Sequence, residues 1–177
     1  SLICIVVLIP FYILISLVVL LKMGRPVLFS QERIGKGEKT FRLYKFRSMT
    51  NAKDRNGNLL EEEKRLTKTG IFLRSSSLDE LPEFFSILKG DMSLVGPRPL
   101  PTYYGPYFRN EERKRHMVKG GLIPPDSLSH KAFTTWEEQF KYEIYYAEHV
   151  SLFLDIKVIV TTFEILLKRM RSNYGSE

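Results

Sequence analysis

The chain has 177 residues, 44% of them hydrophobic and 27% charged, and its formal net charge is +7. This length allows one ordinary domain together with a membrane element, but not two full domains. A single cysteine excludes an internal disulfide framework. The sequence contains no recognisable groove-binding module of the kind that would indicate a nucleic-acid partner.

Residues 2–21 form an apolar run without a charged residue, followed by Lys22 and Arg25. At about 1.5 Å per residue, a helix of this length just crosses a hydrocarbon core of ~30 Å. Pro10 in the middle of the run argues against a straight spanning helix, because proline removes a backbone hydrogen bond and can kink a helix. Since the chain begins inside this run, we expect further residues upstream.

A strongly basic segment follows, with nine Lys or Arg residues against two Glu residues between positions 22 and 53. Such a segment favours anionic lipid headgroups or a phosphorylated substrate as its partner. Residues 27–32 and 41–47, separated by turn-forming residues at 35–38, predict a β-hairpin. Lys45 interrupts the second run, where burial requires an anionic partner. A lysine at the rim of the domain, with its ammonium in water, is the alternative.

Residues 74–100, RSSSLDELPEFFSILKGDMSLVGPRPL, carry the densest chemistry of the chain. Ser77 and Glu80 fit a capping box, which predicts that Asp79 and Glu80 open a helix ending near Lys89. Two prolines then fix the backbone around Arg98, whose guanidinium is always charged and suits phosphate. Two adjacent carboxylates and a rigid arginine indicate an active site. Acids that only complement the helix dipole are the alternative.

The C-terminal part is expected to be helical. Thr135 and Glu138 form a second capping box, and apolar residues at helical spacing predict a final helix over about residues 152–171 with a core or interfacial stripe. Asp155 lies beside this stripe, and a half-buried acid requires a cation or a metal-bound partner. A structural salt bridge is the alternative role for Asp155.

The segment SLDELPEFFSILKGDMSLVGPRPL resembles the signature of the bacterial sugar transferases, the monotopic phosphoglycosyl transferases that move a sugar phosphate from a UDP-sugar to polyprenyl phosphate. The resemblance extends to residues 24–35, to residues 44–49 and to the final helix with its aspartate. It implies an α/β fold, mostly helical with a small β-hairpin. A re-entrant membrane helix is expected over 1–22, and one cytoplasmic catalytic domain with interfacial helices over 23–177. The implied location is the cytoplasmic face of a bacterial inner membrane.

The resemblance also implies the roles of the site residues. Asp79 matches the nucleophile, an aspartate that takes up a phosphoryl group, and Glu80 is expected to contact Mg²⁺, the expected cofactor. Lys45 and Arg98 are expected to supply positive charge for the leaving phosphate. Further substrate contacts are expected from Arg33, Arg47, Arg74 and Asp155.

The chain departs from the family pattern at residues 119–126, KGGLIPPD, where a loop of the type Arg-Pro-Gly-Ile-Thr-Gly is expected. Substrate contacts of that loop therefore do not carry over to this chain.

The function expected from these residues is transfer of a phosphosugar from a UDP-sugar to undecaprenyl phosphate, with release of UMP, at the start of surface glycan assembly. The expected partners are the UDP-sugar, polyprenyl phosphate and membrane lipids, and a homodimer is allowed. Two other classes stay open. A catalytically silent membrane adaptor would use the basic segment to bind anionic lipid. An integral-membrane phosphohydrolase would use the same acids and Mg²⁺ but would need no lipid acceptor.

Overall fold

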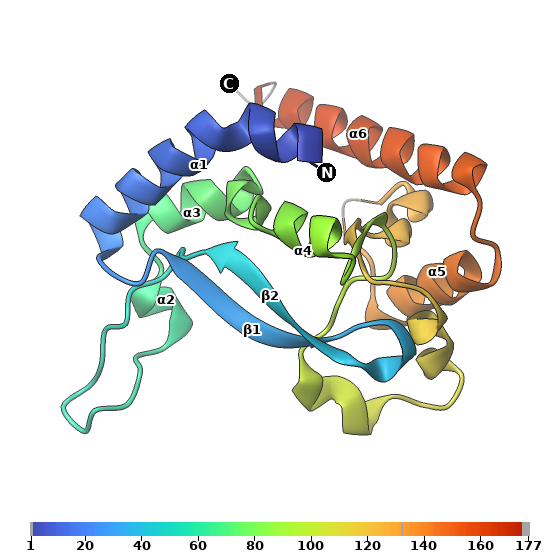
Figure 1. Cartoon of the computed structure of the whole chain (residues 1–177), viewed down its shortest axis with the longest axis horizontal. Coiled ribbons are helices and arrows are strands. Elements are labelled where there is room, and N and C mark those ends of the chain that lie inside the picture. Colours follow the sequence, from blue (N-terminus) through green and yellow to red (C-terminus); the bar gives the residue numbers. More distant parts are fainter. Residues whose placement is uncertain (1, 132, 175–177) are drawn as a thin grey trace. The chain divides into compact units, whose positions relative to one another are not determined.

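The structure is a computed structural model that describes residues 2–131 and 133–174 (Figure 1). Contacts divide the chain into two compact units, Ser1–Gln31 with Arg42–Lys89, and Glu32–Phe41 with Gly90–Glu177. The predicted boundary between a membrane helix and a catalytic domain at residue 22 stays a prediction. Helices dominate both units and the strands are few and short, so the predicted α/β class, mostly helical with a small hairpin, is confirmed.

In the first unit, α1 (Leu2–Met23) is the apolar helix that the sequence predicts, and Pro10 lies inside it. Over Cys4–Met23 this helix is long and apolar enough to cross a membrane, a test that core helices and signal sequences also pass. Its buried residues Ile15 and Val19 join Phe46 in the core of the unit. The re-entrant arrangement of this helix stays a prediction.

The predicted hairpin is confirmed. Its strands are β1 (Leu28–Ile34) and β2 (Thr40–Phe46), joined through the 3₁₀ turn η1 (Lys36–Glu38) (Figure 1). Gly37 has φ +63°, a left-handed conformation that glycine adopts without a steric penalty. The tip of the hairpin belongs to the second unit and its base to the first.

The rest of the first unit consists of α2 (Glu62–Arg65), α3 (Lys68–Ser75), the 3₁₀ turn η2 (Leu78–Glu80) and α4 (Glu83–Lys89). Thr67 caps α3 by accepting a hydrogen bond from Gly70 N at 3.0 Å. A Cβ on Gly70 would lie only 1.8 Å from Ser48 O. Glycine at this position therefore lets α3 pack directly on the backbone that follows the hairpin. Figure 1 shows α1 running over α3 and α4.

The predicted capping box at Ser77 is wrong. Ser77 has φ +54°, in the left-handed region, and its side chain caps nothing. A helix from residue 78 would need a hydrogen bond from residue 82 to Leu78 O, which Pro82 cannot donate. The chain therefore makes a 3₁₀ turn over Asp79 and Glu80 and starts α4 directly after Pro82. The acids precede the helix instead of opening it, and the predicted stop at Lys89 is confirmed.

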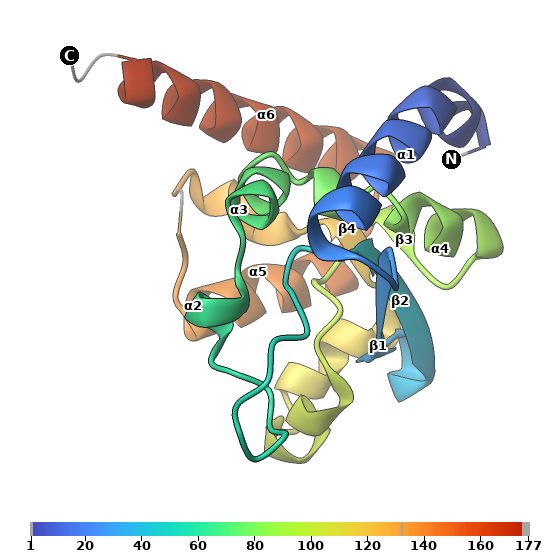
Figure 2. The same ribbon diagram turned by 90° about the vertical axis from the view of Figure 1, so that its left-hand side faces the viewer.

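The second unit has a parallel pair of strands, β3 (Ser93–Val95) and β4 (Gly121–Ile123), in which Ser93 pairs with Gly121 and Val95 with Ile123 (Figure 2). Its helical elements are η3 (Thr102–Tyr107), η4 (Glu112–Met117), η5 (Pro125–Ser129), α5 (Trp136–Glu148) and α6 (Leu152–Tyr174).

Local capping starts α5 as predicted, because the side chain of Thr135 accepts from Glu138 N and the Glu138 side chain accepts from Thr135 N. The long helix α6 packs against the strands through Leu154 and Val158, which lie in one core with Val95. Within the apolar stripe predicted for the final helix, Ile159 is partly buried against this core, whereas four residues are exposed, namely Leu152, Ile156, Phe163 and Leu166. The side chain of Met170, also predicted for this stripe, lies outside the described residues.

Candidate active site

Asp79 is a buried carboxylate on the turn η2, 8% exposed. Burial raises the pKa of Asp79 above its ordinary value, and the neighbouring Glu80 adds to this shift, whereas Lys45 and Arg74 oppose it. A carboxylate with little water around it and with cations nearby is reactive toward phosphorus, because less hydration must be removed before attack.

Lys45 joins this carboxylate cluster from strand β2. Its ammonium Nζ lies 2.6 Å from Glu80 Oε1 and 3.1 Å from Glu83 Oε1. The prediction that an anion pairs with Lys45 is confirmed. Burial by itself lowers the pKa of Lys45, but the two glutamates outweigh burial and the net pKa is raised. Lys45 therefore stays charged at neutral pH.

Arg74 closes the same cluster from the last turn of α3. Its Nε donates to Ser48 Oγ at 2.9 Å, which fixes the side chain against the segment after the hairpin. The Arg74 charge lowers the pKa of Asp79. The first unit thus brings together Lys45, Arg74, Asp79 and Glu80, four of the residues that the sequence singles out.

Among the described residues, no group of three or more His, Cys, Asp and Glu side chains is arranged to hold a metal ion. Mg²⁺ at phosphoryl-transfer sites does not require such a group, since one or two carboxylates with substrate phosphates and water suffice. The Glu80 side chain is 24% exposed. A partly exposed carboxylate of this kind fits a single contact with Mg²⁺ that is completed by substrate phosphate and water.

Arg47 has a different environment from the one expected for a substrate ligand. It is 6% exposed. Its guanidinium donates to Arg25 O and Gly24 O, each at 2.9 Å, and also to Met23 O, so it binds the backbone at the end of α1. These hydrogen bonds give Arg47 a structural role, and its predicted substrate contact stays a prediction.

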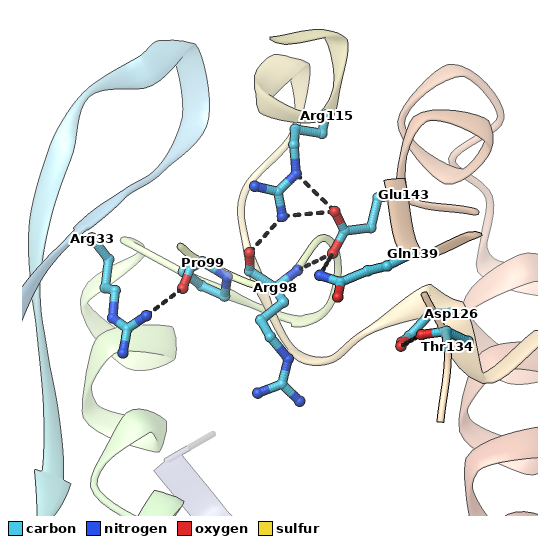
Figure 3. Close-up of polar contacts among 8 residues, drawn as sticks. All are labelled: Arg33, Arg98, Pro99, Arg115, Asp126, Thr134, Gln139 and Glu143. Carbon is cyan, nitrogen blue, oxygen red and sulfur yellow. Dashed lines mark hydrogen bonds and ion pairs between the residues drawn. The ribbon is translucent and has the colours of Figure 1, made fainter. Parts of the chain in front are cut away.

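In the second unit, Arg98 lies between two buried prolines and its own side chain is exposed. Arg98 N donates to Glu143 Oε1 at 2.8 Å, and Arg98 O accepts from Arg115 Nη2 at 2.6 Å. Figure 3 shows the Arg98 guanidinium pointing away from these contacts. Its backbone is held on both sides, while its charged end is presented outward.

Glu143 and Arg115 form the buried ion pair behind this arrangement, 0% and 1% exposed, with Arg115 Nη2 2.6 Å from Glu143 Oε2. Gln139 Nε2 donates to Glu143 Oε1 at 3.0 Å. Burial raises the pKa of Glu143, and the Arg115 guanidinium opposes this shift. The rings of Phe108 and Phe140 lie 5.5 Å and 5.1 Å from the Arg115 guanidinium and keep water from the pair.

Arg33, a predicted substrate ligand, donates Nη1 to Pro99 O at 3.1 Å (Figure 3). This contact ties the end of β1 to the segment that carries Arg98. The predicted substrate contact of Arg33 stays a prediction beside this structural one.

Asp155 has a partner other than the expected cation. The Tyr146 hydroxyl donates to Asp155 Oδ1 at 2.6 Å and lies 3.3 Å from Val95 O. Burial raises the pKa of Tyr146, and the hydrogen bond to the Asp155 carboxylate raises it further. The hydroxyl therefore stays protonated and acts as a donor. A neutral donor thus binds one oxygen of this half-buried acid, and the expected cationic or metal-bound partner stays a prediction. The predicted substrate contact of Asp155 stays a prediction.

Comparison with known proteins gives the family. The sequence model of a protein family described as bacterial sugar transferase matches residues 1–169, which include every site residue named above. The chain belongs to the bacterial sugar transferase family. The resemblance read from residues 77–100 is therefore confirmed.

Individual relatives within the family are similar over most of the chain. The Bacillus subtilis (strain 168) protein named "Uncharacterized sugar transferase EpsL" is 45% identical over 150 residues, 85% of this chain and 74% of that protein. A "UDP-N-acetylgalactosamine-undecaprenyl-phosphate N-acetylgalactosaminephosphotransferase" from Aeromonas hydrophila is 33% identical over 166 residues, 89% of this chain and 39% of the relative. A "UDP-glucose:undecaprenyl-phosphate glucose-1-phosphate transferase" from Xanthomonas campestris pv. campestris is 35% identical over 165 residues, 86% of this chain and 34% of the relative. The chain spans less than half of the last two proteins.

The loop of residues 119–126 contacts the segment that carries Arg98 through its backbone. Gly121 N donates to Pro97 O at 2.9 Å. A Cβ on Gly121 would lie 2.1 Å from Gly96 N, and one on Gly120 would lie 2.6 Å from Pro99 Cγ. Glycines at 120 and 121 therefore let this loop approach the Arg98 segment closely.

Sequence reasoning missed Glu83, Arg115 and Glu143. The signal for Glu83 was present, since it follows Glu80 by three residues, a spacing that places side chains on one side of a helical segment. Arg115 and Glu143 gave no such signal, because residues 28 positions apart meet only through the tertiary fold.

Proposed function

We propose that this chain transfers a phosphosugar from a UDP-sugar to undecaprenyl phosphate and releases UMP, through a covalent intermediate on Asp79. Membership of the bacterial sugar transferase family supports the reaction class. The names of two relatives specify UDP-sugar donors and undecaprenyl phosphate. The single observation that carries the mechanism is the buried Asp79 carboxylate in the electrostatic field of Lys45 and Arg74.

In the first step, an oxygen of Asp79 attacks the phosphorus that carries the sugar. The bond from this phosphorus to the bridging oxygen of the diphosphate breaks, and UMP leaves with the electron pair. In the second step, an oxygen of undecaprenyl phosphate attacks the same phosphorus, and the bond from phosphorus to the Asp79 oxygen breaks. The Asp79 carboxylate is restored and the product is a lipid-linked diphosphate sugar.

Lys45 and Glu80 prepare the first step. The Lys45 ammonium, held by Glu83, supplies fixed positive charge for the oxygens of the diphosphate. Glu80 is the residue that would contact Mg²⁺, which when bound neutralises negative charge on the diphosphate. Since Glu83 also binds the ammonium, Lys45 keeps an anionic partner when Glu80 binds the metal.

Arg98 is proposed to bind substrate phosphate with its exposed guanidinium. Its fork of N–H donors matches two phosphate oxygens at once. The prolines on both sides and the hydrogen bonds to its backbone mean that little conformational entropy is lost when the phosphate binds.

The lipid acceptor requires access to a membrane, and two helices support it. α1 is apolar from Leu2 to Leu21 and carries Lys22 in its last turn. We propose that it is re-entrant at Pro10, with both ends on the cytoplasmic face. α6 exposes a stripe with Ile156 and Phe163, which are 52% and 60% exposed. An apolar helix face of this kind lies favourably in the headgroup region of a bilayer.

Supplying and omitting the lipid tests this function. Purified protein with Mg²⁺ and a panel of UDP-sugars, including UDP-glucose and UDP-N-acetylgalactosamine, should release UMP continuously only when undecaprenyl phosphate is present. Continuous release of UMP and free sugar phosphate without lipid would indicate a phosphohydrolase. Binding to anionic vesicles without release of UMP from any donor would indicate a silent adaptor.

A further inference from the structure

The segment of residues 96–100 presents one charged side chain on a backbone that is held at almost every polar atom. Gly96 N donates to Ile123 O at 3.2 Å, and Arg98 N donates to Glu143. The four successive carbonyl oxygens from Pro97 to Leu100 accept from Gly121 N, Arg115 Nη2, Arg33 Nη1 and Ile34 N, respectively. These hydrogen bonds hold the segment in one backbone conformation, so the direction of the Arg98 Cα–Cβ bond is fixed.

The ion pair of Arg115 and Glu143 supplies the two contacts at Arg98 itself. Glu143 uses Oε1 for Arg98 N and for Gln139, and Oε2 for Arg115. Arg115 in turn reaches Arg98 O with the same Nη2 that binds Glu143 (Figure 3). The pair and the Arg98 peptide groups therefore form one closed network of charge-assisted hydrogen bonds.

A buried ion pair is a weak source of stability, because removing two charges from water costs about as much as their attraction returns. Apolar side chains of similar size would fill the same space without this cost. The contacts to Arg98 N and Arg98 O give the pair a second role, since an apolar replacement could make neither of them.

We propose that Arg115 and Glu143 are positioning residues that act through Arg98, by fixing its backbone so that the guanidinium meets substrate phosphate. This inference rests on the proposed function. Gln139 assists by binding Glu143 Oε1, the oxygen that accepts from Arg98 N. The pair itself does not contact substrate.

The test is a double-mutant cycle. Arg115→Lys keeps the charge but loses the planar fork that reaches Glu143 and Arg98 O together. It should lower kcat/KM for UMP release about tenfold to a hundredfold, the range for one charge-assisted hydrogen bond. In an Arg98→Ala background the same change should have an effect of less than about twofold, because its route to the substrate is gone. The same factor in both backgrounds would overturn the inference.

Arg113→Lys is the matched control. Arg113 lies in the same element η4 and also forks onto a carboxylate and a carbonyl, with Nη1 2.6 Å from Glu38 Oε2 and Nη2 3.2 Å from Gly105 O. Within the described part of the chain, the hydrogen bonds and ion pair of its side chain go to Glu38 and Gly105 and not to residues 96–100. Its variant should therefore keep kcat/KM within about twofold. A loss as large as that of Arg115→Lys would mean that any weakened η4 contact lowers activity, which contradicts a specific role through Arg98.

A second variant covers the case in which Arg115→Lys does not fold, judged by loss of cooperative thermal unfolding. Gln139→Leu leaves the ion pair intact and removes one hydrogen bond from an uncharged donor to Glu143. It should lower kcat/KM about twofold to tenfold, and this effect should vanish in the Arg98→Ala background. If Arg115→Lys is unfolded and Gln139→Leu equals the wild type, the pair is only a folding element and the inference is wrong.

Binding of UDP, measured by calorimetry without lipid, separates this inference from the proposed function. If the wild type releases no UMP from any donor but binds UDP in a manner that requires both Arg98 and Arg115, the function is wrong and the positioning role stands. If the wild type turns over and the cycle is additive, the function stands and the positioning role is wrong. If the wild type neither binds UDP nor turns over, both are wrong.

Discussion

Lys45 and Glu83 form an ion pair of 3.1 Å although Glu83 is only 4% exposed. The same ammonium lies 2.6 Å from Glu80, so Lys45 bridges one buried and one partly exposed carboxylate. A buried carboxylate without a cation is costly. Glu83 is therefore expected to keep hold of Lys45 when Glu80 binds Mg²⁺.

Glu83→Gln tests this bridge. The change keeps the shape of the side chain but leaves Glu80 as the only carboxylate paired with Lys45, so Lys45 and Mg²⁺ compete for Glu80. We expect UMP release to fall about tenfold, roughly the value of one charge-assisted hydrogen bond, and half-maximal activity to need more Mg²⁺. The measurement is UMP release against Mg²⁺ concentration. Glu61→Gln, which removes an exposed pair with Lys64, is the control, and an unchanged Mg²⁺ dependence in Glu83→Gln would contradict the bridge.

The pH dependence of activity should report Asp79. Burial raises the pKa of Asp79, and the ionised form is the nucleophile, so activity should be lost as pH falls through a pKa above the ordinary range of aspartate. Arg74 lowers this pKa. Arg74→Gln should therefore shift the acidic limb of the pH–rate profile to higher pH. Arg55→Gln, in an exposed loop, should leave the limb in place, and a shift of the Arg74 variant to lower pH would exclude the assigned electrostatics.

Arg98→Lys tests the guanidinium directly. Lysine keeps the positive charge but loses the bidentate fork and should cost about 2–3 kcal/mol in the transition state, as for other charge-assisted hydrogen bonds. The measurement is kcat/KM for UMP release, with cooperative thermal unfolding as the check on the fold. Full activity in this variant would give Arg98 a structural role only.

The path of α1 in the membrane is open to cysteine labelling. Pro10 divides the helix into arms of about ten residues, or ~15 Å each, which is half of a ~30 Å hydrocarbon core. In a Cys4→Ala background, Ser1→Cys should not react with an impermeant maleimide added to intact cells, but should react after permeabilisation. Efficient labelling of intact cells would indicate a spanning helix.

Short-range signals predicted much of the fold. The alternation of Phe41 and Leu43 with polar neighbours gave the hairpin, and Thr135 with Glu138 gave the start of α5, because both depend on residues close in sequence. The same rule failed at Ser77. There the missing donor of Pro82 outweighs the capping motif, so the acids lie on a 3₁₀ turn.

The candidate site was predictable only in part, for a physical reason. The sequence identified Asp79, Glu80, Lys45 and Arg98 by their chemistry and by resemblance. It did not show that Arg115 and Glu143 pair with each other and bind the Arg98 backbone, since their ion pair depends on how η4 packs against α5. Residues that support a site through long-range contacts leave no local pattern.

The covalent intermediate on Asp79 is the central claim, and mass spectrometry tests it most directly. Protein incubated with Mg²⁺ and an active UDP-sugar, but without lipid, should release up to one UMP per enzyme, and the peptide that contains Asp79 should gain the mass of a sugar phosphate. Asp79→Asn should abolish both signals and lower turnover by at least about a thousandfold, whereas Glu80→Gln should weaken both. Continued turnover of Asp79→Asn, with no mass added to the wild-type peptide, would contradict the covalent route and favour direct attack by the lipid phosphate.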